Sequence, residues 1–214
     1  AALAEAQNLS VMQLYGDLPG DQQDAVLKRA NRRKIVLATN VAETSITIDG
    51  VRLVIDSGLA RQSGFDPAHG INRLDVVPIS QASAEQRRGR AGRTAPGVCL
   101  RLWSETQHRR RPEHDVPEIH RVELSEVGLG LKSSGETDLR EFPWFDAPSE
   151  GAIQQAEQLL QELGAVNANG GLSAMGQQLL RFPVHPRFGR MMVEAGKRGC
   201  LREMALVSAA LQGK

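Results

Sequence analysis

The sequence predicts an α/β domain built on a parallel sheet, followed by a second, helical region. In the first half, short continuous apolar runs alternate with segments of helical periodicity, a pattern typical of parallel strands covered on both faces. Beyond the stretch 108–117, where prolines interrupt all periodicity, apolar residues recur at helical spacing. A domain boundary is therefore expected in that stretch.

The elements of the first domain are expected to be short. A helix at 21–30 has Asp21 as its candidate N-cap. Residues 1–7 look helical, and because the chain opens inside that segment without an initiator methionine, we interpret it as a fragment. The expected strands lie at 9–14, 34–39, 51–56 and 97–103, with a short helical segment at 40–46.

The stretch 61–80 departs from this alternation. It carries turn signals at Asp66-Pro67 and at 69–72 between alternating segments, which indicates a β-hairpin. A hairpin inserted after a strand end lies near the functional edge of an α/β domain, and such loops often carry function. The alternative is that it only covers a sheet edge.

The second region reads as a series of amphipathic helices. Gly164 is placed to end one of them, residues 167–171 form a strong turn signal, and another short helix opens at 172–173. This order is the pattern of a winged-helix module, and two more helices follow from Pro186. The apolar stripes are expected at Val122, Leu124, Val127 and Leu131, and at Ile153, Ala156, Leu160 and Leu163.

Composition excludes several classes of protein. The chain has 41% hydrophobic and 24% charged residues, which is ordinary for a globular protein, and its formal net charge is only +1. Cys99 and Cys200 have no partner at metal-ligand or redox-motif spacing, which fits a reducing compartment, and we expect both to be small buried side chains. No signal peptide or twenty-residue apolar run is present, which predicts a cytoplasmic protein with no membrane partner.

Positive charge is concentrated in one island. Residues 80–111 hold eight arginines, no lysine and two glutamates, and four of those arginines fall within 86–93. If the helix that starts near Ser80 continued through this motif, i,i+3 and i,i+4 spacing would place Gln86, Arg90 and Arg93 on one face. Such a face could receive the terminal phosphates of a nucleotide. A solvated basic face or a general polyanion patch is the alternative.

Several further segments carry a resemblance to a known family. Residues 14–19, 38–48, 79–83 and 86–93 resemble the second RecA-like domain of the DEAH/RHA-box helicases of superfamily 2, with 38–48 and 86–93 similar to its motifs V and VI. Residues 131–135, 163–165 and 182–187 resemble its winged-helix and ratchet-like regions. Within the family, Asp66-Pro67 and 70–74 lean toward the bacterial HrpB-like branch, with the HrpA-like branch as the alternative.

The resemblance implies a domain order and a fold. A second RecA-like domain of the P-loop NTPase type, with an inserted hairpin and truncated at its N-terminal side, is expected at 1–110. A linker at 111–120 and a winged-helix domain at 121–185 follow, and 186–214 would begin a helical ratchet-like region. His108, His114 and His120 then lie in or beside an irregular, solvated linker, which is a better interpretation than a metal site.

The resemblance also implies roles for single residues. Gln86, Arg90 and Arg93 are expected to contact the phosphates of ATP, and the arginines to stabilise charge during phosphoryl transfer. Asp49 is placed like the acidic residue that reaches the ribose, and Leu27 where many members stack a phenylalanine on adenine. The RNA-backbone contacts are expected from Thr39, Asn40, Thr44 and Arg61.

Each of these residues also has a purely structural interpretation. Thr39 could merely end a strand, Thr44 could cap a turn, and Asp49 could occupy the first position of a type I turn. Leu27 departs from the family pattern, because a leucine can press on a base but cannot stack on it as an aromatic ring does, so weaker base preference is expected.

The expected function is that of the C-terminal helicase portion of an ATP-dependent RNA helicase. The phosphate loop, the Asp-Glu-Ala-His motif that holds Mg²⁺, and the first strand of the second RecA-like domain are not found in this sequence. The fragment alone should therefore not hydrolyse ATP. Its expected partners are single-stranded RNA, or RNA with a single-stranded overhang, and the N-terminal RecA-like domain of the same protein. The alternative is a non-catalytic nucleic-acid-binding or adaptor protein that keeps a RecA-like fold.

Overall fold

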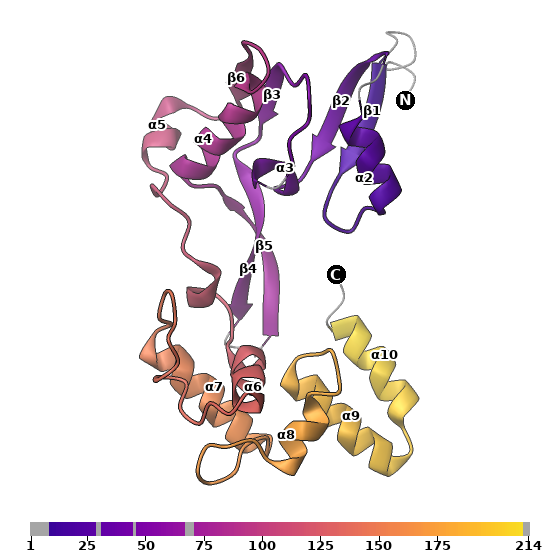
Figure 1. The fold of residues 1–214 in the computed structure, drawn as a ribbon, viewed down its shortest axis with the longest axis vertical. Coiled ribbons are helices and arrows are strands. Elements are labelled where there is room, and N and C mark those ends of the chain that lie inside the picture. Colours follow the sequence, from indigo (N-terminus) through magenta and orange to yellow (C-terminus); the bar gives the residue numbers. More distant parts are fainter. Residues whose placement is uncertain (1–8, 29–30, 45, 67–70, 212–214) are drawn as a thin grey trace. The chain divides into compact units, whose positions relative to one another are not determined.

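The computed structural model describes residues 9–28, 31–44, 46–66 and 71–211, and the description below concerns these residues. They fall into two compact units (Figure 1). The first contains the residues up to 64 together with 73–116, and the second contains 65–72 together with the residues from 117 on. No helix in the described part is long and apolar enough to cross a membrane.

The first unit is an α/β structure, as predicted. Its two longer helices are α2 (Gly20–Leu27) and α4 (Gln81–Gly89), and a 3-10 helix, η1 (Arg90–Gly92), continues directly from α4. The short helices are α3 (Val41–Thr44) and α5 (Glu105–Arg109). The strands are β1 (Leu9–Leu14), β2 (Arg33–Ala38), β3 (Leu53–Asp56) and β6 (Val98–Arg101). The strands β4 (Leu59–Asp66) and β5 (Ile71–Pro78) form a hairpin that begins and ends in this unit, while the end of β4 and the start of β5 are assigned to the second unit.

The strands pair in parallel, but in two separate pairs. β1 pairs with β2, where Leu9 lies opposite Arg33, and β3 pairs with β6, where Leu53 lies opposite Val98. Within the described residues, β2 and β3 do not pair with each other. Each pair therefore keeps an unpaired edge within the described residues.

The predicted burial of these strands on both faces is wrong for this chain. On one face of β2 and of β3 the apolar side chains are largely exposed to solvent. The exposed fraction is 57% for Leu37, 58% for Leu53 and 61% for Ile55. A parallel sheet needs a layer on each face, and the short helices present here cover one face of each pair. The apolar runs therefore identify the strands correctly but overstate their burial.

The core of the first unit lies under β1 and α2. Leu14, Leu18 and Val26 are buried together, and Met12 and Val36 pack against them from the two paired strands. The predicted cap of α2 is wrong, since Pro19 occupies the N-cap position and Asp21 lies in the first turn. An acidic side chain there still favours the positive end of the helix, which explains why the sequence pattern indicated a helix start. Residues 1–7 and the end of the predicted helix at 29–30 lie outside the described residues.

The second unit is helical, as predicted. A 3-10 turn, η2 (Glu118–His120), precedes the helices, and an isolated antiparallel bridge joins Val166 to Leu172 around the predicted turn. Its core gathers Leu129, Leu160, Ala165 and Leu179. The helices are α6 (Ser125–Ser133), α7 (Glu150–Glu162), α8 (Ala174–Leu179), α9 (Pro186–Arg198) and α10 (Leu201–Leu211).

One of the two predicted apolar stripes is confirmed. Ile153, Ala156 and Leu160 are buried along α7, and Gly164 follows it with a positive φ of 69°, as a helix end with a left-handed residue requires. The other stripe is out of phase. Leu124 precedes α6 instead of lying in it, and Val127 is 42% exposed, because the inward face of α6 is Gly128, Leu129 and Lys132.

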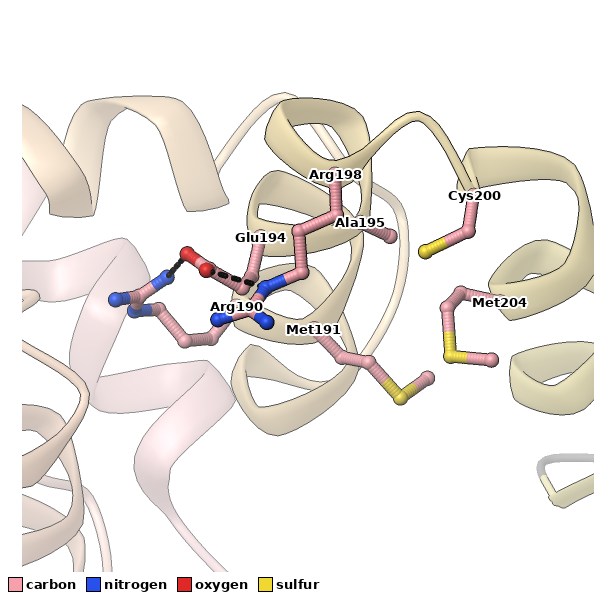
Figure 2. Close-up of a pocket in the computed structure, with 7 residues that line it drawn as sticks. All are labelled: Arg190, Met191, Glu194, Ala195, Arg198, Cys200 and Met204. Atoms are coloured by element: carbon pink, nitrogen blue, oxygen red, sulfur yellow. Dashed lines mark hydrogen bonds and ion pairs between the residues drawn. The ribbon is translucent and has the colours of Figure 1, made fainter.

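The two cysteines are free thiols and are half-buried, so they are less buried than expected. Burial raises the pKa of the Cys99 thiol, which keeps it protonated near neutral pH. Cys200 lines a hollow of about 380 Å³ between α9 and α10, where Met191 and Met204 face it (Figure 2). The charged groups at its rim are paired among themselves, with Glu194 bonded to Arg198 at 2.8 Å. The hollow therefore has the apolar, sulfur-rich lining of a packing gap.

Candidate functional site

The arginine-rich motif lies at the end of α4. The Ser80 hydroxyl accepts a hydrogen bond from the backbone N–H of Ser83 at 3.1 Å and so caps α4, which agrees with a helix start expected near Ser80. The α-helix ends at Gly89, and η1 tightens the chain at Arg90. The expectation of one continuous α-helix through Arg93 is therefore wrong, although both arginines still turn to a common neighbour.

That neighbour is the segment after β2. The Arg90 guanidinium donates to the backbone carbonyl oxygens of Glu43 and Ile46, the latter at 3.0 Å, and Arg93 donates to the hydroxyl of Thr47. Burial and the neighbouring charge of Arg93 both lower the pKa of Arg90 from its usual value. Two guanidiniums that repel each other favour an anion between them. The Nε–H of Arg90 is buried and has no hydrogen-bond partner in the described part of the chain.

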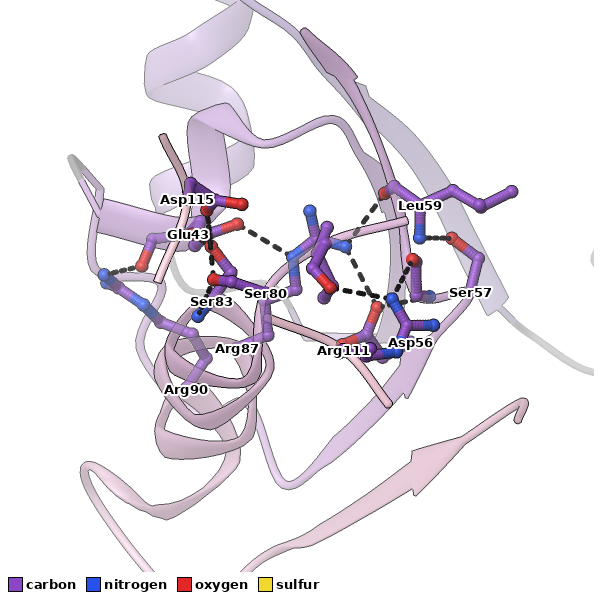
Figure 3. A network of polar contacts seen from close by, with 12 residues as sticks. Glu43, Asp56, Ser57, Leu59, Ser80, Ser83, Arg87, Arg90, Arg111 and Asp115 are labelled. Atoms are coloured by element: carbon purple, nitrogen blue, oxygen red, sulfur yellow. Dashed lines mark hydrogen bonds and ion pairs between the residues drawn. The ribbon is translucent and has the colours of Figure 1, made fainter. Parts of the chain in front are cut away.

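The third predicted member, Gln86, is exposed on α4 one turn before Arg90. The helix thus presents Gln86 to solvent and turns Arg87 inward. Arg87 Nε bonds Glu43 Oε2 and its Nη1 bonds Asp56 Oδ1, both at 2.9 Å (Figure 3). Burial alone would lower the pKa of Arg87, but the hydrogen bonds to these two carboxylates outweigh it and raise the pKa.

Arg87, Glu43 and Asp56 form a buried ion-pair cluster beside the predicted site, and the helix spacing did not indicate it. Their side chains are 15%, 13% and 1% exposed, so the two ion pairs are largely removed from water. They join α4 to α3 and to the end of β3. A signal was present in the sequence, since Glu43 comes shortly after one predicted strand and Asp56 ends another, in a domain whose arginines are concentrated in one helix.

Thr39 and Asn40 lie where β2 ends and α3 begins, and both are exposed. The backbone N–H of Thr39 donates to the carbonyl of Leu14 at 3.1 Å, and the carbonyls of Thr39 and Asn40 accept from Ala42 and Glu43. The backbone of Thr39 is therefore occupied by the fold, which leaves its hydroxyl for a ligand. The side chain of Thr44 lies outside the described residues.

The hydrogen bonds and ion pairs described above for Arg87, Arg90 and Arg93 do not include the remaining predicted residues. Leu27 is the last residue of α2 and is half-buried beside β1. Asp49 is exposed in a turn before Gly50, whose φ of 79° suits a glycine. Arg61 is exposed on β4. Within the described residues, no group of three or more His, Cys, Asp or Glu side chains could hold a metal ion.

Gly97 limits the space around η1. A Cβ at this position would lie 1.9 Å from the carbonyl oxygen of Ala91 and 2.8 Å from that of Arg52. The chain that leads into β6 therefore passes directly against the turn that carries Arg90. Only a residue without a side chain permits this approach.

A second polar cluster lies in the other unit. Glu123 Oε2 accepts from the Ser125 hydroxyl at 2.5 Å and from His185 Nε2 at 2.8 Å. His185 Nδ1 accepts from the backbone N–H of Arg187, so the ring caps α9 while its Nε2–H bonds the carboxylate. Burial alone would raise the pKa of Glu123, but the bonds from His185 and Ser125 outweigh it and lower the pKa.

Comparison with known proteins agrees with both units. Residues 1–95 match the family described as the helicase conserved C-terminal domain. Residues 156–184 and 185–214 match the winged-helix and ratchet-like parts of the helicase associated domain, HA2.

Similar proteins match across nearly the whole chain. The chain is 43% identical to the ATP-dependent RNA helicase HrpA of Escherichia coli over 96% of its own length and 16% of that protein. It is 41% identical to the pre-mRNA-splicing factor ATP-dependent RNA helicase prp22 of Schizosaccharomyces pombe, over 95% of the chain and 18% of that protein.

Solved structures give the same result. The crystal structure of the Escherichia coli DEAH/RHA helicase HrpB superposes with a TM-score of 0.83 at 39% identity, over 96% of this chain and 26% of that one. HrpA and HrpB of Escherichia coli thus each match 96% of the chain at comparable identity. The chain spans less than a fifth of the length of the curated relatives it matches. The chain is therefore similar to DEAH/RHA helicases of the HrpA and HrpB type over a region that contains the helicase conserved C-terminal domain and the winged-helix and ratchet-like parts of HA2.

Proposed function

We propose that the longer protein containing this chain is a cytoplasmic ATP-dependent RNA helicase. In this proposal Gln86, Arg90 and Arg93 form one wall of the ATP site, and the segment after β2 contacts RNA. The observation that carries the proposal is that Arg90 and Arg93 both bond residues of the segment after β2, together with a buried Nε–H on Arg90 that has no partner within the described residues.

The chemistry of this donor set fits a polyphosphate. Guanidiniums donate two parallel hydrogen bonds to phosphate oxygens and keep their charge at any working pH. As the terminal phosphoryl group transfers to water, charge spreads over its oxygens, and arginines aimed at it stabilise the transition state. Arg90 would exchange its two backbone carbonyl acceptors for phosphate oxygens, and Arg93 would exchange Thr47. Leu27 would press on the base and Asp49 would bond the ribose.

The RNA face is proposed at the C-terminal end of β2, where ligands of open α/β sheets bind. Thr39 and Asn40 are exposed there, and Thr44 and Arg61 complete the proposed set. Contacts to phosphates and sugars carry no sequence information, so binding should tolerate many sequences and weaken with added salt. A single strand, or a duplex with a single-stranded overhang, is the proposed substrate, and the preceding RecA-like domain would hold Mg²⁺ with ATP.

The experiment compares Arg90→Ala and Arg93→Ala with Arg88→Ala in the longer protein. Arg88 is the matched control because it is exposed and pairs only with Glu85 on the same helix. Each of the first two variants should lower kcat for ATP hydrolysis about a thousandfold or more with RNA affinity retained, since an arginine finger contributes about 10³–10⁵ in rate. Arg88→Ala should keep the parent rate. A protein that binds RNA but never hydrolyses ATP would instead be an adaptor.

A further inference from the structure

The segment that leaves the first unit is bonded to the first turn of α4. The backbone N–H groups of Gln81 and Ala82 donate to the carbonyls of Pro112 and Glu113, both at 2.9 Å. The Gln81 side chain also donates to the carbonyl of Arg111 at 2.8 Å. The first N–H groups of a helix have no partner within it, so this segment supplies what α4 lacks. The sequence suggested a solvated linker here, but its backbone is held.

Arg111 fixes the beginning of this segment. Its Nη1 donates to the carbonyls of Gly58 and Ile79, at 3.0 and 2.8 Å. Its guanidinium also lies 4.5 Å from the ring centre of Trp103, a cation–π contact. Residues 111–113 are therefore attached to the first unit through both backbone and side chain.

Asp115 attaches the end of the same segment to α4 through two buried serines. Asp115 Oδ2 lies 3.1 Å from the Ser80 hydroxyl and 2.8 Å from the Ser83 hydroxyl (Figure 3). Ser80 is fully buried and Ser83 is 7% exposed. Buried hydroxyls depend on protein partners, since water does not reach them to replace a lost bond.

The Ser83 hydroxyl lies between two carboxylates. It is 2.6 Å from Glu43 Oε1, on the segment proposed to contact RNA, and 2.8 Å from Asp115 Oδ2. A hydroxyl has a single hydrogen to donate, so it can satisfy only one of these acceptors at a time. Glu43 keeps its bond to Arg87 through Oε2 in either case. Asp115 likewise keeps its bond to Ser80.

We propose that Ser83 and Asp115 are positioning residues that couple ATP hydrolysis to the movement of the second unit. The inference rests on the proposed function. When Arg90 leaves the carbonyl of Glu43 for a phosphate, α3 is released on one side, and the Ser83 hydroxyl is redistributed between Glu43 and Asp115. The chain enters the second unit two residues after Asp115, so the bond that Asp115 gains or loses acts directly on that connection.

The test uses the longer protein and measures two rates, RNA-stimulated ATP hydrolysis and duplex unwinding. In Asp115→Ala and in Ser83→Ala, ATP hydrolysis should stay near the parent rate, because neither residue contacts ATP in the proposed site. The number of base pairs opened per ATP should fall about fivefold or more, the lower end of usual couplings between sites. A merely structural defect would lower both rates together and leave their ratio unchanged.

Two variants serve as controls. Asp115→Asn keeps an oxygen that accepts from both serines, so it should restore the ratio. Glu113→Ala removes an exposed neighbouring carboxylate whose residue bonds α4 only through its backbone, so it should behave as the parent. A parent-like ratio in Asp115→Ala, or a ratio that Asp115→Asn does not restore, would overturn the inference.

Hydrogen exchange gives a reading that does not depend on ATP hydrolysis. The amides of Gln81 and Ala82 should exchange faster in Asp115→Ala than in the parent or in Asp115→Asn, since the segment that accepts their hydrogen bonds loses its anchor. Unchanged exchange refutes the attachment even if the protein hydrolyses no ATP. Absence of ATP hydrolysis in the parent protein would refute the proposed function alone.

Discussion

Arg90 donates a hydrogen bond to the backbone carbonyl of Glu43, so the arginine proposed to bind ATP contacts the segment proposed to bind RNA. The same Glu43 holds Arg87 through its side chain. One residue therefore receives both inward-facing arginines of the motif. Arg87 and Arg90 therefore both contact the segment after β2 directly, with no other element between them.

The variants Arg90→Ala and Arg93→Ala should differ in their unfolding temperatures, although both arginines are proposed to act on ATP. Arg90→Ala removes hydrogen bonds from a charged donor to two carbonyls, each worth about 1.5–3 kcal/mol, whereas Arg93 is exposed. Without nucleotide, Arg90→Ala should lower the unfolding temperature of this unit clearly more than Arg93→Ala. Differential scanning fluorimetry measures the difference, and equal losses would mean that Arg90 does not rest on the segment 43–47.

Arg87→Ala should be the most destabilising substitution in the motif. It leaves the carboxylates of Glu43 and Asp56 without this cation. Removing one partner of a buried ion pair lowers the free energy of unfolding by about 3–5 kcal/mol. Arg88→Ala breaks an exposed pair with Glu85 and should cost at most about 1 kcal/mol. Denaturant unfolding of the two variants should separate their midpoints. Arg87→Lys should fall between them, because one ammonium cannot reproduce a two-sided fork.

Glu123 should make the second unit sensitive to acid. Its pKa is lowered below 4.5 in the folded state, so the unfolded chain binds the proton more tightly. The stabilisation is fully present above the unfolded pKa and is lost as the pH falls through the lower folded pKa. Helix content followed from pH 7 down to about pH 3 should reveal this loss.

Glu123→Gln is the control for that titration. It should be less stable than the parent at pH 7, because the carboxylate accepts with both oxygens, Oε2 from the Ser125 hydroxyl and His185 and Oε1 from the Ser125 backbone N–H, whereas an amide turns a donor toward one of these sides. It should also lose the part of the acid dependence that arises below pH 4.5. An identical acid profile in parent and variant would show that another group dominates the unit.

Thr39 should act on RNA through its hydroxyl. The backbone N–H of Thr39 is already bonded to Leu14, which leaves the side chain as its available donor. In the longer protein, Thr39→Ala should abolish the stimulation of ATP hydrolysis by RNA while basal hydrolysis remains, and Thr39→Ser should retain it. Stimulation that survives in Thr39→Ala would remove this residue from the RNA contact.

The sequence predicted the strands of the first unit and α7 because each has an unbroken local pattern. It misplaced the cap of α2, since Pro19 and Asp21 both favour a helix start and only the backbone decides between them. It misread the phase of α6, since a glycine and a lysine, Gly128 and Lys132, form part of the inward face. No apolar pattern reveals a lysine that is buried because it donates to the carbonyl of Thr137.

The site was predictable in its residue types and less so in its contacts. Motif resemblance singled out Arg90 and Arg93, and the structure places both against the segment 43–47. The inward turn of Arg87 depends on Asp56, which is distant in sequence, so helix spacing alone could not reveal it. The roles of Leu27 and Asp49 remain predictions.

Gly97 has a consequence for how substitutions across this chain would be tolerated. It bears no functional group, yet any side chain there would collide with the carbonyl of Ala91 in the turn that carries Arg90. In a survey of every possible replacement, Gly97 should be as intolerant as the arginines themselves. A ranking of positions by their sensitivity to substitution would then suggest a chemical role for this glycine that it does not have. Gly97 is required only because the turn at Ala91 leaves no room for a Cβ atom.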